Sequence, residues 1–226
     1  MCNVENIRNG RNIQTTKDLN LNDLLNSSFA KLKIIECLIS SGVEINLVNK
    51  LGETPLHMCR NRDVCKLLLD NGAIMNFKEI TGKQPLFSYL LRANYDICVE
   101  LIKSGCELDT TDRLGNTLLN ALMHSNAPIK LILLLLEAGI GLKEFQEKIP
   151  EKFQKDPKLF KAIEFRLKNP PSLKEIARKS LRLHLNRINH YKSIVNSVSK
   201  LERLLPSSLQ DYILLNLNKI ESILIK

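Results

Sequence analysis

Apolar residues recur along most of the chain with the three-to-four-residue spacing of amphipathic helices. Four of these runs end in a short stretch that contains a glycine and then an apolar-x-polar exit: ECLISSGVEIN, KLLLDNGAIMN, ELIKSGCELD and LLLLEAGIGL. Their glycines are Gly42, Gly72, Gly105 and Gly139, separated by 30, 33 and 34 residues. A glycine directly after a helix is typical of a left-handed C-cap, which costs glycine no steric strain. The pattern therefore predicts a stack of similar helical units.

A second motif lies between these glycines. Its copies are LGETPLHMC, TGKQPLFSYL and LGNTLLNAL, which begin at Leu51, Thr81 and Leu114. In the first copy Pro55 suits the first turn of a helix, where its missing N–H needs no partner, and Thr54 can cap the same end. His57 is expected to bridge neighbouring backbone, which disfavours a catalytic or metal-binding role for it. The copies resemble the G-x-T-P-L-H-x-A motif of the ankyrin repeat, whose period is about 33 residues.

The resemblance predicts an ankyrin-repeat solenoid of about four units in residues 19–142. Residues 20–49 form a leading, degenerate unit, because helical spacing is present there but no TPLH copy precedes it. The brief NRD turn after HMC predicts a short first helix in the second unit. Residues 1–18 lack periodicity and are interpreted as a flexible arm.

Ankyrin stacks bind partner proteins through their hairpin tips and concave face, so the resemblance implies recognition without chemistry. The candidate substrate-binding residues are polar residues at the expected tips: Asn49, Lys50, Lys78, Glu79, Asp112 and Arg113. The sequence does not identify the protein substrate.

Residues 143–170 are predicted to form a helical linker. Their spacing indicates one or two amphipathic helices, interrupted by Pro150 and Pro157. Pro170-Pro171 ends the segment, because a proline disfavours a helical conformation in the residue before it. A separate C-terminal module is therefore expected to follow.

The C-terminal module begins with SLKEIARKSLRLHL. Ser172 is a candidate N-cap, and Glu175 is its capping-box partner three residues later. One face of this helix contains Leu173, Ile176, Ala177, Leu181 and Leu185. Further on, in LERLLPSSLQDYILLNL, Pro206 ends one helical run, and the next has an apolar stripe of Leu209, Ile213 and Leu217.

These residues resemble a SOCS box. Its first helix follows L-x-x-x-C-x-x-x-L, which Leu173 and Leu181 match, while Ala177 replaces the usual cysteine. The LPxxLxxYL stretch resembles a cullin box, matched by Leu205, Pro206, Leu209, Tyr212 and Ile213. With the upstream repeats, the chain resembles the ankyrin repeat and SOCS box family. The expected fold is all-α: a solenoid, a three-helix SOCS box at 171–217 and a tail at 218–226.

Members of this family are non-enzymatic substrate receptors of ubiquitin ligases. The resemblance implies that Leu173, Ile176, Ala177 and Leu181 bind elongin C of the elongin B/C adaptor. It also implies that Leu205, Pro206, Leu209 and Tyr212 bind cullin-5, which carries a RING-box protein. Helix-in-groove docking with Leu173 as anchor is the expected mechanism. The alternatives are an ankyrin scaffold or inhibitor outside any ligase, and an ankyrin protein with an F-box-like C-terminus.

Composition narrows the possible partners. The net charge of +9 arises entirely in residues 141–226, which hold 18 basic and 9 acidic residues. Aromatic residues are not interleaved with these cations as stacking platforms would be, so a solvated basic surface is favoured, and neither nucleic acid nor membrane is expected as a partner. Phosphate loops, nucleophile elbows and metal-ligand clusters are absent, which predicts no cofactor and no enzymatic activity.

The cysteines and the lack of a long apolar run bear on location. The six cysteines form no CxxC pair, and most lie in apolar helical patterns, which favours reduced thiols. The longest apolar run is far shorter than the roughly 18 residues that a membrane span requires. An intracellular protein is expected, in the cytoplasm and with the nucleus as a second location.

Overall fold

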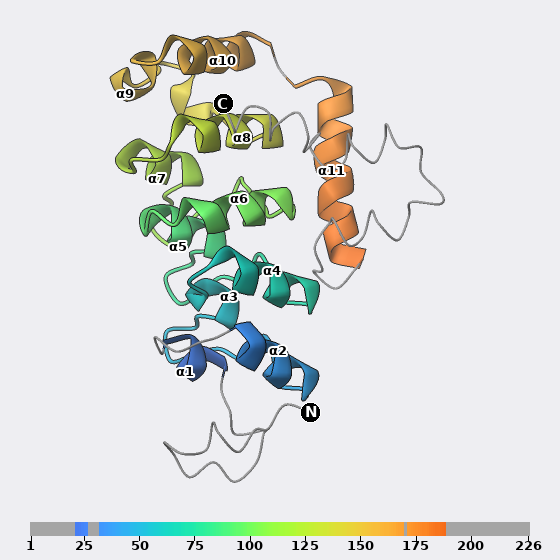
Figure 1. Ribbon diagram of the computed structural model, residues 1–226. Helices are drawn as coiled ribbons and strands as arrows, with labels where there is room; N and C mark the ends of the chain where they lie inside the picture. The colour runs from blue at the N-terminus through green and yellow to red at the C-terminus, as the bar shows by residue number, and fades with distance from the viewer. Residues whose placement is uncertain (1–20, 27–31, 170, 189–226) are drawn as a thin grey trace.

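The computed structural model describes residues 21–26, 32–169 and 171–188 (Figure 1). Within these ranges the regular elements are helices, and the strand-like pairing found there is one isolated antiparallel bridge between Thr111 and Thr117. The described part therefore has the all-α character that the sequence predicts. None of its helices is long and apolar enough to cross a membrane.

Helix pairs stack into one column, with the first helices in one row and the second helices in another (Figure 1). The four pairs are α1 (Leu21–Asn26) with α2 (Leu32–Ser40), α3 (Pro55–Met58) with α4 (Arg62–Asp70), α5 (Pro85–Leu91) with α6 (Tyr95–Lys103), and α7 (Leu118–His124) with α8 (Ile129–Ala138). Four such pairs in the described residues agree with a helical solenoid of the expected kind. The four glycines predicted after the second helices all have positive φ, from 80° to 93°.

Local capping explains where the helices begin. Asn61 caps α4, and its side chain accepts a hydrogen bond from the Val64 N–H at 2.8 Å. Thr117 caps α7 by accepting from the Asn120 N–H at 3.1 Å, while the Asn120 side chain accepts from the Thr117 N–H at 2.9 Å. The second unit has a first helix of only four residues, α3, as the short NRD turn predicts.

Residues 143–169 extend the same column. They form the 3-10 helix η3 (Lys143–Phe145), α9 (Glu151–Gln154) and α10 (Pro157–Lys168). Pro157 is the first residue of α10, and the side chain of Asp156 caps it by accepting from Leu159 N–H at 2.8 Å. Helix α10 packs against α8, and four side chains of this segment are buried in the core that the repeats share: Phe145, Phe153, Leu159 and Ile163. The segment predicted as a linker is thus helical and is also packed onto the last repeat.

The cysteines described here differ in state. Cys59, Cys65, Cys98 and Cys106 are buried free thiols, and burial raises the pKa of Cys98 to about 12, so this thiol stays protonated. Cys37 is disulfide-bonded, which departs from the expectation of reduced thiols.

Helix α11 (Leu173–Ile188) follows Pro171 and runs along the side of the column, past the ends of α8 and α6 (Figure 1). Its predicted capping box is present: the Ser172 N–H donates to the Glu175 carboxylate at 2.8 Å, and the Glu175 N–H donates to Ser172 Oγ at 3.3 Å. The remainder of the predicted SOCS box lies outside the described residues, as do the predicted arm, the tail and the predicted cullin-binding residues Leu205, Pro206, Leu209 and Tyr212.

Candidate protein-binding surfaces

Helix α11 contacts the column through its polar face. Arg178 is only 7% exposed, and its guanidinium donates to the Glu137 carbonyl at 2.7 Å and to the Glu137 carboxylate at 3.3 Å. One turn of α11 thereby binds the end of α8. Lys179 donates to the Gly139 carbonyl at 3.1 Å and forms an ion pair with Asp109, which lies in the hairpin after α6.

The end of α8 attracts these cations for a physical reason. The last four carbonyls of a helix have no intrahelical donor, and the helix dipole concentrates negative potential there. Arg166 of α10 donates to the carbonyl of Leu136 at 3.0 Å, beside the carbonyls that Arg178 and Lys179 bind. Three cations from two helices therefore satisfy the C-terminal end of α8.

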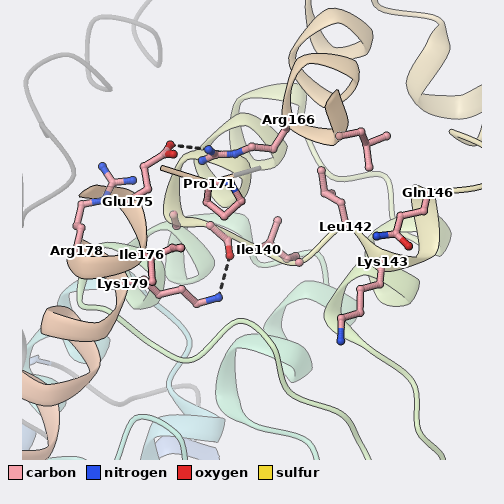
Figure 2. A pocket seen from close by; sticks show the side chains of 14 residues that line it. Ile140, Leu142, Lys143, Gln146, Arg166, Pro171, Glu175, Ile176, Arg178 and Lys179 are labelled. Atoms are coloured by element: carbon pink, nitrogen blue, oxygen red, sulfur yellow. Dashed lines mark hydrogen bonds and ion pairs between the residues drawn. The ribbon is translucent and has the colours of Figure 1, made fainter. Parts of the chain in front are cut away.

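An ion pair joins the start of α11 to α10. Arg166 and Glu175 approach within 2.5 Å, and the hydrogen bond from Arg166 holds the pKa of the Glu175 carboxyl below its ordinary value. Figure 2 shows the two side chains facing each other, with Lys179 reaching toward the end of α8. Between these elements lies a pocket of about 460 Å³, whose lining includes Ile140 and Leu142. Polar contacts on its rim thus fix the position of α11.

The predicted elongin C-binding residues lie on the neighbouring arc of α11, and one of them, Ile176, also lines the pocket between α11 and the column (Figure 2). Leu173 is 85% exposed, Ile176 50% and Leu181 37%, and Ala177 is exposed as well. At roughly 100° per residue these four side chains cover an arc of about 140°, and the column-facing side chains occupy the rest of the circumference. We refer to the four residues as the α11 stripe. Leu173, Ala177 and Leu181 are exposed to solvent, while Ile176 is half-exposed and borders the pocket.

The predicted substrate-binding residues separate into two groups at the hairpin tips. Asn49, Glu79 and Asp112 hold the turns, because each side chain accepts hydrogen bonds from the backbone N–H groups two and four residues later, at 2.7 to 3.2 Å. Lys50, Lys78 and Arg113 are exposed. The three residues that accept hydrogen bonds therefore stabilise the turns, whereas the three cations are exposed to solvent.

Both acidic turn residues are held in the ionised form. A side-chain hydrogen bond from Asn116 lowers the pKa of Asp112. Burial acts to raise the pKa of Glu79, but hydrogen bonds from Thr81 and Lys83 outweigh it and leave this pKa below its ordinary value. The two carboxylates therefore act as hydrogen-bond acceptors within their own turns.

Three large apolar side chains at the tips are exposed beside the predicted polar residues. Leu51 is 61% exposed, Ile80 48% and Leu114 86%. Their signal in the sequence is an apolar residue one or two positions before a tip glycine, inside an otherwise polar turn.

The tips are joined to one another. The Ile80 N–H donates to the Leu51 carbonyl at 3.1 Å, and the Arg113 N–H donates to the Thr81 carbonyl at 2.9 Å. This close approach requires glycine, because a Cβ added to Gly82 would lie 2.8 Å from the backbone nitrogen of Arg113. The tips therefore form one continuous edge, which we call the tip edge (residues 49–51, 78–81 and 111–114).

His57 supports the tip edge from inside. It is fully buried, and its Nδ1 accepts from the Thr54 N–H at 3.2 Å, while Nε2 lies 3.3 Å from the Lys83 carbonyl. A carbonyl can only accept, so Nε2 carries the proton and the ring is neutral. Burial lowers the pKa of His57. This histidine bridges backbone of two repeats, as expected from the motif. In the part of the chain that the structure describes, no group of three or more His, Cys, Asp or Glu side chains could hold a metal ion.

Comparison with known proteins agrees with this architecture. Residues 25–112 match the family described as ankyrin repeats (3 copies). The chain is 32% identical over 81 residues to a protein of Rickettsia felis named as an ankyrin repeat protein, covering 31% of this chain and 36% of that protein. It is 43% identical over 60 residues to Fowlpox virus ankyrin repeat protein FPV233, covering 24% of this chain and 12% of that protein. The matched regions thus span about a third or less of these relatives.

Residues 25–112 of the column are therefore ankyrin repeats, and repeats of this kind suggest a role in protein–protein interaction. Among the described residues, the α11 stripe and the tip edge are candidate surfaces for that role.

Proposed function

We propose that the chain is the substrate-recognition subunit of an elongin B/C–cullin-RING ubiquitin ligase. In this proposal the ankyrin repeats bind the protein substrate, residues 171–217 bind elongin C and cullin-5, and another subunit transfers the ubiquitin. The observation that carries the proposal is the outward orientation of the α11 stripe.

An amphipathic helix beside a protein core ordinarily turns its apolar face inward. Helix α11 departs from this arrangement, because Arg178 and Lys179 bind the column while Leu173 is 85% exposed, and Ile176 is the one stripe residue that also lines the pocket. Apolar side chains that gather on an exposed face commonly mark a protein-binding site. A helix with such a face suits a hydrophobic groove on a partner, which is the helix-in-groove mode of recognition.

The polar contacts also prepare α11 for binding. The Ser172 capping box fixes the first turn, and the Arg166–Glu175 pair holds that turn against α10. Leu173 is the first residue of the helix and is the anchor of the proposed contact. Because the helix is already formed and positioned, less conformational entropy is lost on binding. Ala177 provides less volume than the cysteine usual in the family, so its share of the contact is smaller.

Co-expression with elongin B/C tests the proposal. We expect a stable ternary complex with the wild-type chain and loss of that complex with Leu173→Asp, since removing an anchor from a desolvated pocket costs about 2 kcal/mol or more, roughly thirtyfold in affinity. Leu114→Asp is the matched control, because Leu114 is 86% exposed against 85% for Leu173 but lies at a hairpin tip.

The control variant should keep the complex. Circular dichroism of all three proteins checks that they are folded. A folded wild-type chain that does not bind elongin B/C contradicts the proposal, and equal loss with Leu173→Asp and Leu114→Asp contradicts the assignment of the α11 stripe.

A further inference from the structure

The tip edge displays a repeated pattern of apolar and basic side chains. Lys50-Leu51 stands at the first tip, Ile80-Thr81 at the second and Arg113-Leu114 at the third. Each tip therefore presents one large apolar side chain, and the two outer tips add a cation. Because all of these residues except Thr81 are long or bulky and all are exposed, they dominate what a partner meets there.

Charges on the edge are not equally available. The carboxylates of Glu79 and Asp112 accept hydrogen bonds within their own turns, and Asp112 is only 7% exposed. The exposed charges that point outward from the tips are those of Lys50 and Arg113, together with Lys78, whose ammonium also donates to the Thr111 carbonyl at 2.9 Å. The edge is thus apolar and basic toward a partner, although its turns contain acidic residues.

The edge is also preorganised. Backbone hydrogen bonds of 3.1 and 2.9 Å join the first tip to the second and the second to the third. Ile80 packs directly on Gly52, since a Cβ on that glycine would lie 3.2 Å from the Ile80 Cγ1. Arg113 packs in the same way on Gly82, since a Cβ on that glycine would lie 3.0 Å from the Arg113 Cγ. A binding partner therefore meets side chains whose backbone is already fixed, which reduces the entropic cost of association.

We infer that the tip edge binds a peptide segment that combines large apolar residues with aspartate or glutamate. Its apolar side chains pack on Leu51, Ile80 and Leu114, and its carboxylates pair with the neighbouring cations. Complementary charge selects the partner and speeds association, while the apolar anchors supply most of the affinity. The inference deepens the proposed function by naming the substrate class, and it rests on that function only in treating the partner as a ubiquitination substrate.

Selection from a random peptide display library on the purified full chain tests the apolar part. We expect enriched peptides to contain both acidic and large apolar residues and to bind at least tenfold more weakly to Leu51→Ser/Ile80→Ser/Leu114→Ser. Leu91→Ser is the matched control, because Leu91 is 52% exposed but lies on α5 outside the edge, and it should leave affinity unchanged. Enrichment of basic peptides, or no enrichment at all, overturns the inference.

The charge part uses the same peptides. Lys50→Glu/Lys78→Glu/Arg113→Glu should weaken binding of the peptides tenfold or more. Lys66→Glu should not change it, because Lys66 is an exposed cation of α4 outside the tip edge. A single-stranded RNA of random sequence is the competing probe. If RNA binds more tightly than the peptides and only the charge reversal abolishes its binding, the edge is a nucleic-acid surface and the inference is wrong.

Failure of this inference can be told apart from failure of the proposed function. Leu173→Asp should leave peptide affinity intact while it abolishes elongin B/C binding. Leu51→Ser/Ile80→Ser/Leu114→Ser should weaken peptide binding while it leaves elongin B/C binding intact. The two surfaces are measured with different ligands in the same protein preparations. A failure of peptide binding therefore leaves the elongin B/C result standing, and the reverse also holds.

Discussion

The contact between the second and third hairpin tips can be tested by Gly82→Ala. Gly82 has φ +84°, and a left-handed backbone costs a residue with a Cβ about 1–2 kcal/mol. The added Cβ would also lie 2.8 Å from the Arg113 nitrogen, which is closer than two such atoms approach, so the third tip must move away. That movement lengthens the 2.9 Å bond from Arg113 N–H to the Thr81 carbonyl, which contributes about 1 kcal/mol. The expected total is about 2–3 kcal/mol.

Gly115→Ala separates the two contributions. Gly115 has φ +80° but no atom within 4 Å of the position that a Cβ would take, so this variant should lose only the conformational part, about 1–2 kcal/mol. Urea unfolding followed by circular dichroism measures both. We expect Gly82→Ala to lose about 1 kcal/mol more than Gly115→Ala, and to bind the selected peptides more weakly. Equal losses would refute the reasoning, because they would mean that the tips do not press on each other.

Two further predictions concern the buried His57 of the repeats and the contact of Arg178 with α8. Burial lowers the pKa of His57 below the unfolded value of 6.5. Between these two pKa values the unfolded chain binds more protons than the folded chain. The free energy of unfolding therefore falls as pH drops below 6.5, by up to about 1.4 kcal/mol per pH unit. His57→Asn copies Asn120, which makes the same capping bond in the fourth unit with a side chain that does not titrate. Urea unfolding from pH 7 to 5 should therefore show a smaller pH dependence, and an identical dependence would contradict the assignment. Arg178→Met leaves the Glu137 carbonyl without its donor, so we expect faster amide exchange in α11 and unchanged exchange in α4 and α6, measured by hydrogen–deuterium exchange. Exchange in α11 that matches wild type would show that Arg178 does not hold the helix.

Much of the repeat architecture is predictable from the sequence because each unit is specified locally. A glycine after each second helix and a TPLH-like start to the first helices are short-range signals, and both are found where the pattern places them. The stacking of residues 143–169 is harder to predict, since no glycine or TPLH copy marks that pair. Residues 143–169 join the column because Phe145 and Phe153 are buried in the shared core, where the centroids of their two rings lie 5.2 Å apart.

The orientation of α11 could not be read from its own sequence. Its apolar stripe is compatible with packing inward or with binding a partner, and the choice is made by residues far away in the chain. Arg178 binds Glu137 across 41 positions, and Lys179 binds Asp109 across 70. Likewise, polarity alone suggested that Asn49 and Asp112 contact substrate, whereas hydrogen bonds to their own turns engage these side chains. Their predicted role in binding remains a prediction.

The polar contacts described between α11 and the column lie at the C-terminal end of the column. Each polar contact described for this helix joins it to Asp109, to the end of α8 or to Arg166 of α10. A chimera in which other ankyrin units replace the residues before Asp109 would retain all of these contacts. The first two tips of the tip edge could therefore be exchanged, by evolution or by design, without loss of these contacts to the C-terminal helix.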